Sequence, residues 1–201
     1  MKWLKQQLRQ SLQAKRRQLS PSLQLNYSKR IAHLLFQQSY FRQAQNIALY
    51  FAFAGEVSTT LILKQALALH KTCYLPVLTD RHLKFVNVDL ATPLTKNKFG
   101  ILEPTPPFTK IIAPQALDLV LVPLVAFDLK GHRLGMGKGY YDVTFAFKHS
   151  FTKPSAGKPL GGKPRLVGLA YDFQRINNVP RANFDVLLDE IVTENTVYSI
   201  S

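Results

Sequence analysis

The segment Leu117–Asp128, LDLVLVPLVAFD, constrains the fold of this chain more than any other. It is apolar almost throughout and lacks the alternation of a strand that has one face in water. Such a run is typical of a strand buried on both faces, which is the environment inside a parallel sheet covered by helices on each side. The segment therefore predicts the central strand of an α/β protein.

Shorter segments on both sides of this run extend the pattern. Strands are expected at IALYFAFAG, ending at Gly55, and at TCYLPVL, LKFVNVD, LVGLAY and DEIVTE. Helices are expected over residues 2–18, from the Ser20–Pro21 cap through Leu35, after Ser58 or Thr59, and from near Tyr140. The alternation predicts a Rossmann-like three-layer α/β fold, in which helices flank a mainly parallel central sheet on both sides. No internal repeat or domain boundary is visible, so residues 1–201 are expected to form a single domain.

A glycine-rich stretch, GHRLGMGKGYYD, follows the central run directly and precedes a predicted helix. Open α/β sheets bind ligands at this position, beyond the carboxyl ends of their strands. Glycines let backbone amides approach an anion, a helix N-terminus adds favourable partial charge, and Arg133 and Lys138 add full charge. The stretch fits neither the P-loop nor the dinucleotide-binding pattern. It predicts a phosphate site of another kind, and the alternative is a glycine-rich turn without a ligand.

The charge of the chain is strongly and unevenly basic. Lysine and arginine number 26 against 12 acidic residues, a formal charge of +14, and no acidic residue precedes Glu56. Such a surface attracts polyanions, which include nucleic acid, anionic lipid, nucleotides and polycarboxylates. Charge alone does not select among them.

The chain carries no sign of a membrane or secretory protein. No apolar run is long enough to cross a bilayer, and the basic N-terminus lacks the apolar segment of a signal peptide. The single cysteine, Cys73, lies in the predicted strand TCYLPVL and is expected to be an inert core thiol. We therefore expect a cytoplasmic monomer that has no membrane partner.

Five segments, in order along almost the whole chain, resemble the 5-formyltetrahydrofolate cyclo-ligase family, also called methenyltetrahydrofolate synthetase. They are the K-x-x-x-R of Lys5 and Arg9, YFAFAGEVST, FGILEP, the RLGMGKGYYD of the glycine-rich stretch, and FDVLLDEIVTE. Each is weak alone, but together and in order they are specific. The resemblance implies an enzyme that uses ATP and Mg²⁺ to convert 5-formyltetrahydrofolate into 5,10-methenyltetrahydrofolate, releasing ADP and phosphate. The formyl oxygen would be phosphorylated and N10 would then attack the activated carbon.

The resemblance also implies roles for individual residues. ATP would be bound by Lys5 and Arg9 and by the loop residues Arg133, Leu134, Gly135, Met136, Gly137, Lys138, Gly139, Tyr140 and Tyr141. Arg133 and Lys138 would be catalytic, by stabilising charge on the γ-phosphate. Mg²⁺ would be bound by Asp142 and Asp185, and the folate would contact Phe51, Glu56, Met136 and Tyr140.

Each of these roles has an ordinary structural alternative. Lys5 and Arg9 would otherwise be solvated charges on a basic helix, Asp142 a carboxylate that interacts with a helix dipole, and Phe51 plain strand core. Met136 departs from the family pattern, in which arginine or tyrosine stands, and its thioether can only pack against the pterin. The resemblance implies no role for the basic loop from Phe151 to Arg165. The alternatives are a loop that closes over the nucleotide and a disordered insertion, of which we expect the second.

Two other functions stay open at this point. The charge would suit a nucleic-acid-binding protein on the same fold without ligase activity, although Glu56, Asp142 and Asp185 argue against a groove for a polyanion. A related ATP-dependent enzyme with a different substrate is the other alternative, because the ATP motifs match better than the folate contacts.

Overall fold

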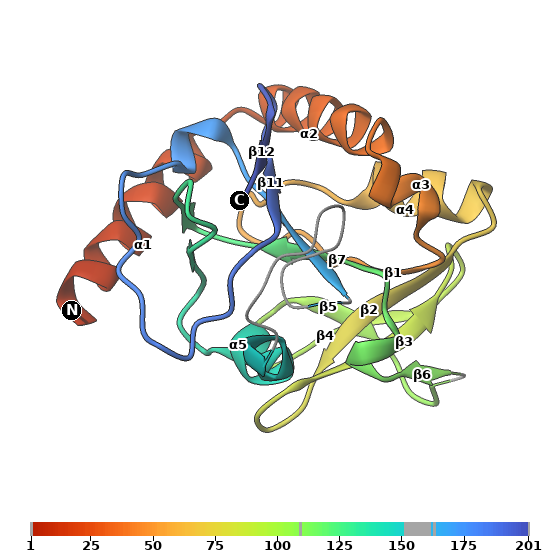
Figure 1. Ribbon diagram of the computed structural model, residues 1–201. Coiled ribbons are helices and arrows are strands. Elements are labelled where there is room, and N and C mark those ends of the chain that lie inside the picture. Colours follow the sequence, from red (N-terminus) through yellow and green to blue (C-terminus); the bar gives the residue numbers. More distant parts are fainter. Residues whose placement is uncertain (1, 109, 151–161, 163, 201) are drawn as a thin grey trace.

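An eight-stranded mixed sheet runs through the centre of the protein in the computed structural model, which describes residues 2–108, 110–150, 162 and 164–200 (Figure 1). The strand order is β12-β11-β10-β7-β1-β2-β3-β6. These strands are β1 (Asn46–Ala48), β2 (Thr72–Leu78), β3 (Leu83–Val88), β6 (Ile111–Ile112), β7 (Leu119–Pro123), β10 (Arg165–Leu169), β11 (Glu190–Val192) and β12 (Val197–Ser199). The five strands from β11 to β2 in this order are parallel to one another. β12 pairs antiparallel with β11, β3 pairs antiparallel with β2, and the edge strand β6 pairs antiparallel with β3.

Helices cover both faces of this sheet. They are α1 (Lys2–Gln18), α2 (Pro21–Phe36), α3 (Ser39–Gln43), α4 (Thr60–Ala68) and α5 (Tyr140–Thr144). Side chains of α2, α3 and α4 share one buried cluster with Leu119 and Leu121 of β7, while the α5 segment shares a second cluster with Val120 and Val122. Alternate residues of β7 therefore point to opposite faces, as the period of a strand requires. The predicted three-layer α/β arrangement with a mainly parallel sheet is confirmed.

The predicted central strand divides in two. β7 ends at Pro123, and Ala126–Phe127 forms β8, which pairs with β9 (Arg133–Leu134) in a separate two-stranded sheet. Proline has no N–H to continue a ladder. The carbonyls of Leu124 and Val125 instead accept hydrogen bonds of 3.0 and 2.9 Å from the Gln174 side chain. The segment is buried except at Asp118 and Pro123, which are partly exposed. The apolar run therefore predicts burial well, but it does not predict where the strand ends.

The prediction of a strand through Gly55 is also wrong, because β1 ends at Ala48. Local hydrogen bonds replace the ladder beyond it: the Tyr50 hydroxyl donates to the Val57 carbonyl, and the Thr59 hydroxyl donates to the Tyr50 carbonyl. Ala54 and Gly55 both have positive φ, which closes a tight turn that no strand can contain. Thr59 occupies the N-cap position of α4, but its hydroxyl makes no capping bond.

The first two helices and the strands β2 and β3 lie where they were predicted. Helix α5 begins at Tyr140 but ends at Thr144, and a 3₁₀ turn, Ala146–Ser150, follows it. Cys73 is a buried free cysteine, and burial raises the pKa of its thiol to about 12, so it stays protonated. No helix in the described parts of the chain is both long and apolar enough to cross a membrane. Most of the basic loop 151–165 lies outside the described residues.

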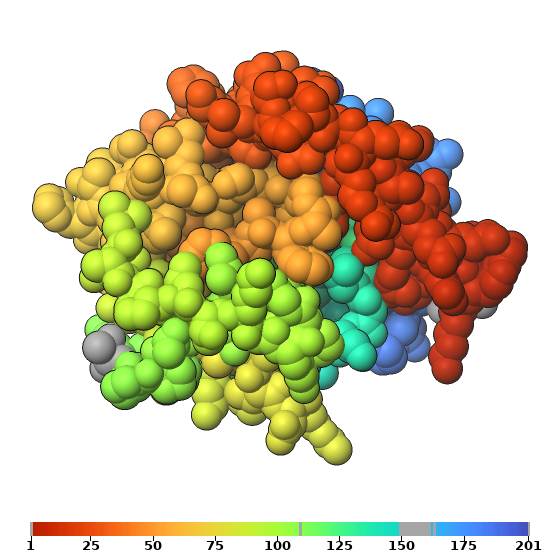
Figure 2. All heavy atoms as spheres, turned by 180° about the vertical axis from the view of Figure 1, so that it is seen from behind, coloured from red at the N-terminus to blue at the C-terminus, as the bar shows by residue number. Residues whose placement is uncertain are grey.

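Figure 2 shows the face on which the elements around the glycine-rich stretch meet. The segment that contains it (cyan) lies between α1 (red) and the chain near residue 100 (green), with the segment after β1 (orange) beside it. The small hairpin of β4 (Leu94–Lys96) and β5 (Leu102–Pro104) borders the same region. Four segments that are far apart in the sequence are thus brought to one place.

Candidate functional site

The glycine-rich loop connects β9 to α5. Leu134 is buried in β9, Gly135 is partly exposed, and the exposed part of the loop begins at Met136. Gly137 has φ of 97°, and Gly139, the N-cap residue of α5, has φ of 70°. An L side chain at either position would be strained, so glycine is required by the backbone itself. The segment that contains this loop lies on the face of the molecule that Figure 2 shows.

Helix α1 holds this loop from one side. Arg9 Nε donates a hydrogen bond of 2.8 Å to the Gly135 carbonyl. Its guanidinium also lies against Gly137, where an added Cβ would come within 3.2 Å of Arg9 Cζ. Lys5, one turn earlier, lies 3.5 Å from the Asp185 carboxylate. The two residues lie on one face of α1, from which Arg9 contacts the loop and Lys5 contacts Asp185.

The segments that carry the two predicted metal-binding residues are in contact. Asp142 Oδ1 accepts a 3.1 Å hydrogen bond from the backbone N–H of Val186, the neighbour of Asp185. Asp142 Oδ1 also lies 2.6 Å from Arg133 Nη2. Asp185 Oδ2 accepts from the Ala182 amide at 2.7 Å. Carboxylates 43 positions apart in the sequence are therefore placed at one end of the glycine-rich loop.

Arg133 has a different environment from the one that was predicted. Its guanidinium is buried, with 5% of the side chain exposed, and binds the Asp142 carboxylate and the Val186 carbonyl. An arginine committed in this way fixes the orientation of the carboxylate. In this arrangement Arg133 contacts the candidate metal ligand and does not point freely into the site.

Lys138, by contrast, is an exposed residue of the loop. Its ammonium is 5.7 Å from the ring centre of Phe99, and that of Lys98 is 5.5 Å from the same ring. A cavity of about 340 Å³ opens beside them, bordered further by Asp80, Arg81, Tyr140 and Val143. Phe99 is 37% exposed. Sequence reasoning noted its FGILEP segment but assigned Phe99 no role, because nothing in the sequence places that hairpin beside Lys138.

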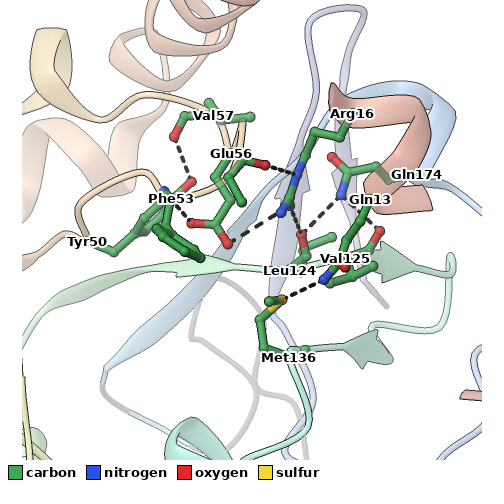
Figure 3. Close-up of polar contacts among 12 residues, drawn as sticks. Gln13, Arg16, Tyr50, Phe53, Glu56, Val57, Leu124, Val125, Met136 and Gln174 are labelled. Atoms are coloured by element: carbon green, nitrogen blue, oxygen red, sulfur yellow. Dashed lines mark hydrogen bonds and ion pairs between the residues drawn. The ribbon is translucent and has the colours of Figure 1, made fainter. Parts of the chain in front are cut away.

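Glu56 occupies the turn after β1, and Figure 3 shows its surroundings. Its side chain is 9% exposed, and Oε2 accepts a 3.1 Å hydrogen bond from the Phe53 amide. Oε1 lies 3.9 Å from Nη1 of Arg16. Burial raises the pKa of Glu56 to about 6, although the Arg16 charge and the Phe53 amide oppose the change. The carboxylate is therefore easily protonated just below neutral pH.

The remaining predicted residues line or support this region. Tyr140 begins α5 and borders the cavity, whereas Tyr141 stacks on Phe145 at 6.3 Å between ring centres. Met136 is 51% exposed, and its sulfur accepts a 2.9 Å hydrogen bond from Gln13 Nε2. Phe51 packs against the core beneath α2 and α4, which agrees with its structural alternative.

Two residues of α1 that contact this region could not be identified from motifs. Gln13 and Arg16 follow Arg9 by four and seven positions, so all three share one face of α1. Figure 3 shows Gln13 directed at Met136, and Arg16 directed at Glu56 and the Leu124 carbonyl. The helical spacing from Arg9 was a usable signal, because it predicts that these side chains face the same loop.

The fold and the site together define an α/β protein with a glycine-rich loop beyond its central parallel strands, where open α/β sheets bind their ligands. The profile of the 5-formyltetrahydrofolate cyclo-ligase family matches residues 1–194. The chain belongs to this family, so the prediction of an enzyme of this class is confirmed.

Individual relatives agree with this assignment. The 5-formyltetrahydrofolate cyclo-ligase of Haemophilus influenzae is 41% identical over 75% of this chain and 76% of its own length. That of Escherichia coli K12 is 31% identical over 93% of this chain and 98% of its own. The structure of Aquifex aeolicus 5,10-methenyltetrahydrofolate synthetase, 32% identical, aligns with a TM-score of 0.81 over 98% of this chain and 93% of that one.

Proposed function

We propose that this protein uses ATP and Mg²⁺ to convert 5-formyltetrahydrofolate into 5,10-methenyltetrahydrofolate, with ADP and phosphate as products. The γ-phosphoryl group passes to the formyl oxygen, which leaves an iminium phosphate at N5. N10 attacks the activated carbon and loses its proton, and phosphate departs with the former formyl oxygen. This chemistry needs no protein nucleophile, which agrees with the buried, protonated Cys73.

The observation that carries the proposal is the convergence of opposite charges at the glycine-rich loop. Arg9, Lys5 and Lys138 border it with positive charge, while Asp142 and Asp185 lie at its end. The loop amides and the cations suit a triphosphate, and two carboxylates suit a divalent ion shared with it. A groove for nucleic acid would gain nothing from those carboxylates.

The two carboxylates fit Mg²⁺ on the chemistry of their donors. Mg²⁺ takes one or two protein carboxylates and completes its shell with phosphate oxygens and water, and the described residues offer no cluster of three acidic, histidine or cysteine ligands. Asp142 and Asp185 would hold the ion, and Arg133 would keep Asp142 in place. When bound, the ion would neutralise charge on the phosphate oxygens.

In this proposal the chain's own side chains act by positioning and by charge. Arg9 and Lys138 would contact ATP phosphates from two sides of the loop, and Lys138 would stabilise charge on the transferring group. Arg133 would act through Asp142 and not by direct contact. Glu56 would accept hydrogen bonds from the amine and ring N–H edge of the reduced pterin. Met136, Tyr140 and Phe99 would pack against the rest of the folate.

A single assay tests the proposal. Purified protein is incubated with ATP, Mg²⁺ and 5-formyltetrahydrofolate, and the absorbance of the methenyl product is followed. We expect product formation that requires both ATP and the divalent ion, with one ADP formed per methenyl group. Product without ADP, or ATP hydrolysis that is indifferent to the folate, would contradict it.

A further inference from the structure

Helix α1 contacts both halves of the site through one face. Arg9 binds the Gly135 carbonyl and Gln13 binds Met136, both in the glycine-rich loop. Arg16, two turns after Arg9, donates from Nε to the Ala54 carbonyl at 3.0 Å and from Nη1 to the Leu124 carbonyl at 3.4 Å. One rigid helix thus connects the loop proposed for ATP with the turn that carries Glu56.

Arg16 is an unusual residue at this position because it is charged and only 1% exposed. Burying a guanidinium costs several kcal/mol unless it gains hydrogen bonds and a countercharge. Two carbonyls satisfy part of it, but Nη2 has no hydrogen-bond partner within the described chain. The nearest carboxylate is that of Glu56, at 3.9 Å. The buried cation therefore faces the carboxylate without a tight bidentate contact.

We propose that Arg16 is a positioning residue, which holds Glu56 ionised and oriented toward the folate. The inference rests on the proposed function, in which Glu56 is the folate contact. Nε fixes the Ala54–Gly55 turn, and the charge on the same guanidinium favours the carboxylate form of Glu56. A neutral side chain could supply the first effect, but only a cation supplies the second.

The other titratable groups that face Glu56 do not replace this cation. They are the hydroxyls of Tyr50, Tyr141 and Tyr171. Burial raises the pKa of each of these tyrosines, so all three are neutral at physiological pH. Among the described residues, Arg16 is the charged group that lowers the pKa of Glu56, and it thereby opposes the effect of burial.

The test compares Arg16→Gln with Arg17→Gln. Arg17 is an exposed arginine that follows Arg16 on the same helix, and its Nε donates a hydrogen bond to the Gln13 carbonyl. The first measurement is the ¹³C NMR titration of the Glu56 carboxyl in the ligand-free protein. In wild type and in Arg17→Gln we expect a pKa of about 6. In Arg16→Gln we expect the pKa of Glu56 to lie above about 7, because the unit charge 3.9 Å away is lost and only the Phe53 amide still opposes the effect of burial.

The second measurement is the affinity for 5-formyltetrahydrofolate as a function of pH. In Arg16→Gln we expect the affinity at pH 7 to fall about tenfold or more and to recover partly by pH 9, with ATP affinity in the absence of folate unchanged. Arg16→Lys, which keeps the charge, should restore most of the affinity at pH 7. An unchanged Glu56 titration in Arg16→Gln, or equal loss in Arg16→Lys, would overturn the inference.

The ¹⁵N resonances of the wild-type Arg16 guanidinium keep the inference testable if Arg16→Gln does not fold. They should titrate with the pKa of Glu56 and lose that transition in Glu56→Gln, and a pH-independent signal would overturn the inference. The ligand-free titrations also separate this inference from the proposed function. If Glu56 responds to Arg16 as expected but wild type does not bind the folate, the proposed function fails and the electrostatic coupling stands.

Discussion

Arg9 and Gly137 are in direct contact although 128 positions separate them: a Cβ added to Gly137 would lie 3.2 Å from both Cζ and Nη2 of Arg9. The same guanidinium binds the Gly135 carbonyl, so the helix and the loop fix each other's positions. The contact explains why a basic N-terminal helix belongs to the site. It also makes Gly137 the loop position at which a small change has the largest expected effect.

Gly137→Ala should therefore lower the free energy of unfolding by about 1–2 kcal/mol, because alanine at φ of 97° is strained and its methyl group displaces Arg9. ATP affinity should fall with it. Gly135→Ala is the matched control, since its φ is not in the left-handed range and no atom lies within 4 Å of an added Cβ. Its stability should stay within about 0.5 kcal/mol of wild type in denaturant titrations. Equal destabilisation by both variants would contradict the assignment.

Much of the fold could be predicted from the sequence, because burial leaves a direct pattern. The apolar run 117–128 is buried as expected, except at Asp118 and Pro123. Its division at Pro123 was missed because Leu124 and Val125 are satisfied by Gln174, fifty residues later. The end of β1 was missed for a similar reason. Strand boundaries depend on distant hydrogen-bond partners that a local pattern does not contain.

The site shows the same limit. The glycine-rich loop, Arg9 and Asp142 could be found from motifs, since each lies within a recognisable segment. The hydrogen bonds from Arg133 to Asp142 and Val186 could not be predicted, because they depend on where the segment after β10 packs against the loop. The contact between Lys138 and Phe99 likewise depends on where the β4–β5 hairpin packs.

Removing a candidate metal ligand should reduce turnover at low Mg²⁺. In Asp142→Asn the amide oxygen can still accept from the Val186 N–H, but the charge is lost. We expect kcat at limiting Mg²⁺ to fall at least about tenfold to a hundredfold, with partial recovery at high Mg²⁺. Asp89→Asn, an exposed carboxylate in the turn after β3, is the control. A wild-type rate for Asp142→Asn at limiting Mg²⁺ would exclude Asp142 as a ligand.

The cationic cavity predicts a preference for longer folate tails. Arg81, Lys98 and Lys138 border it from three different segments. A polyglutamylated substrate carries several carboxylates, so its affinity should fall more steeply with added salt than that of the monoglutamate. Lys98→Gln should bring the two salt slopes closer, and Lys29→Gln on α2 should not. If the salt dependence is the same for both substrates in wild type, substrate binding does not explain the excess positive charge of the chain.

The pH dependence of folate binding should follow the ionisation of Glu56. Its pKa in the ligand-free protein is raised to about 6 by burial, so the carboxylate predominates above that pH and the neutral acid below it. Only the carboxylate offers both oxygens as acceptors, so wild-type affinity for 5-formyltetrahydrofolate should fall as the pH is lowered through about 6.

Glu56→Gln places an amide donor against the pterin donors and loses a charge-assisted bond of roughly 1.5–3 kcal/mol. Its affinity should be about tenfold to a hundredfold weaker at pH 7.5 and should show no transition near pH 6, which isothermal titration calorimetry can measure. ATP affinity, measured without folate, should be unchanged in this variant. A variant that loses both ligands equally would indicate misfolding, and one that keeps the wild-type pH profile would show that Glu56 does not contact the folate.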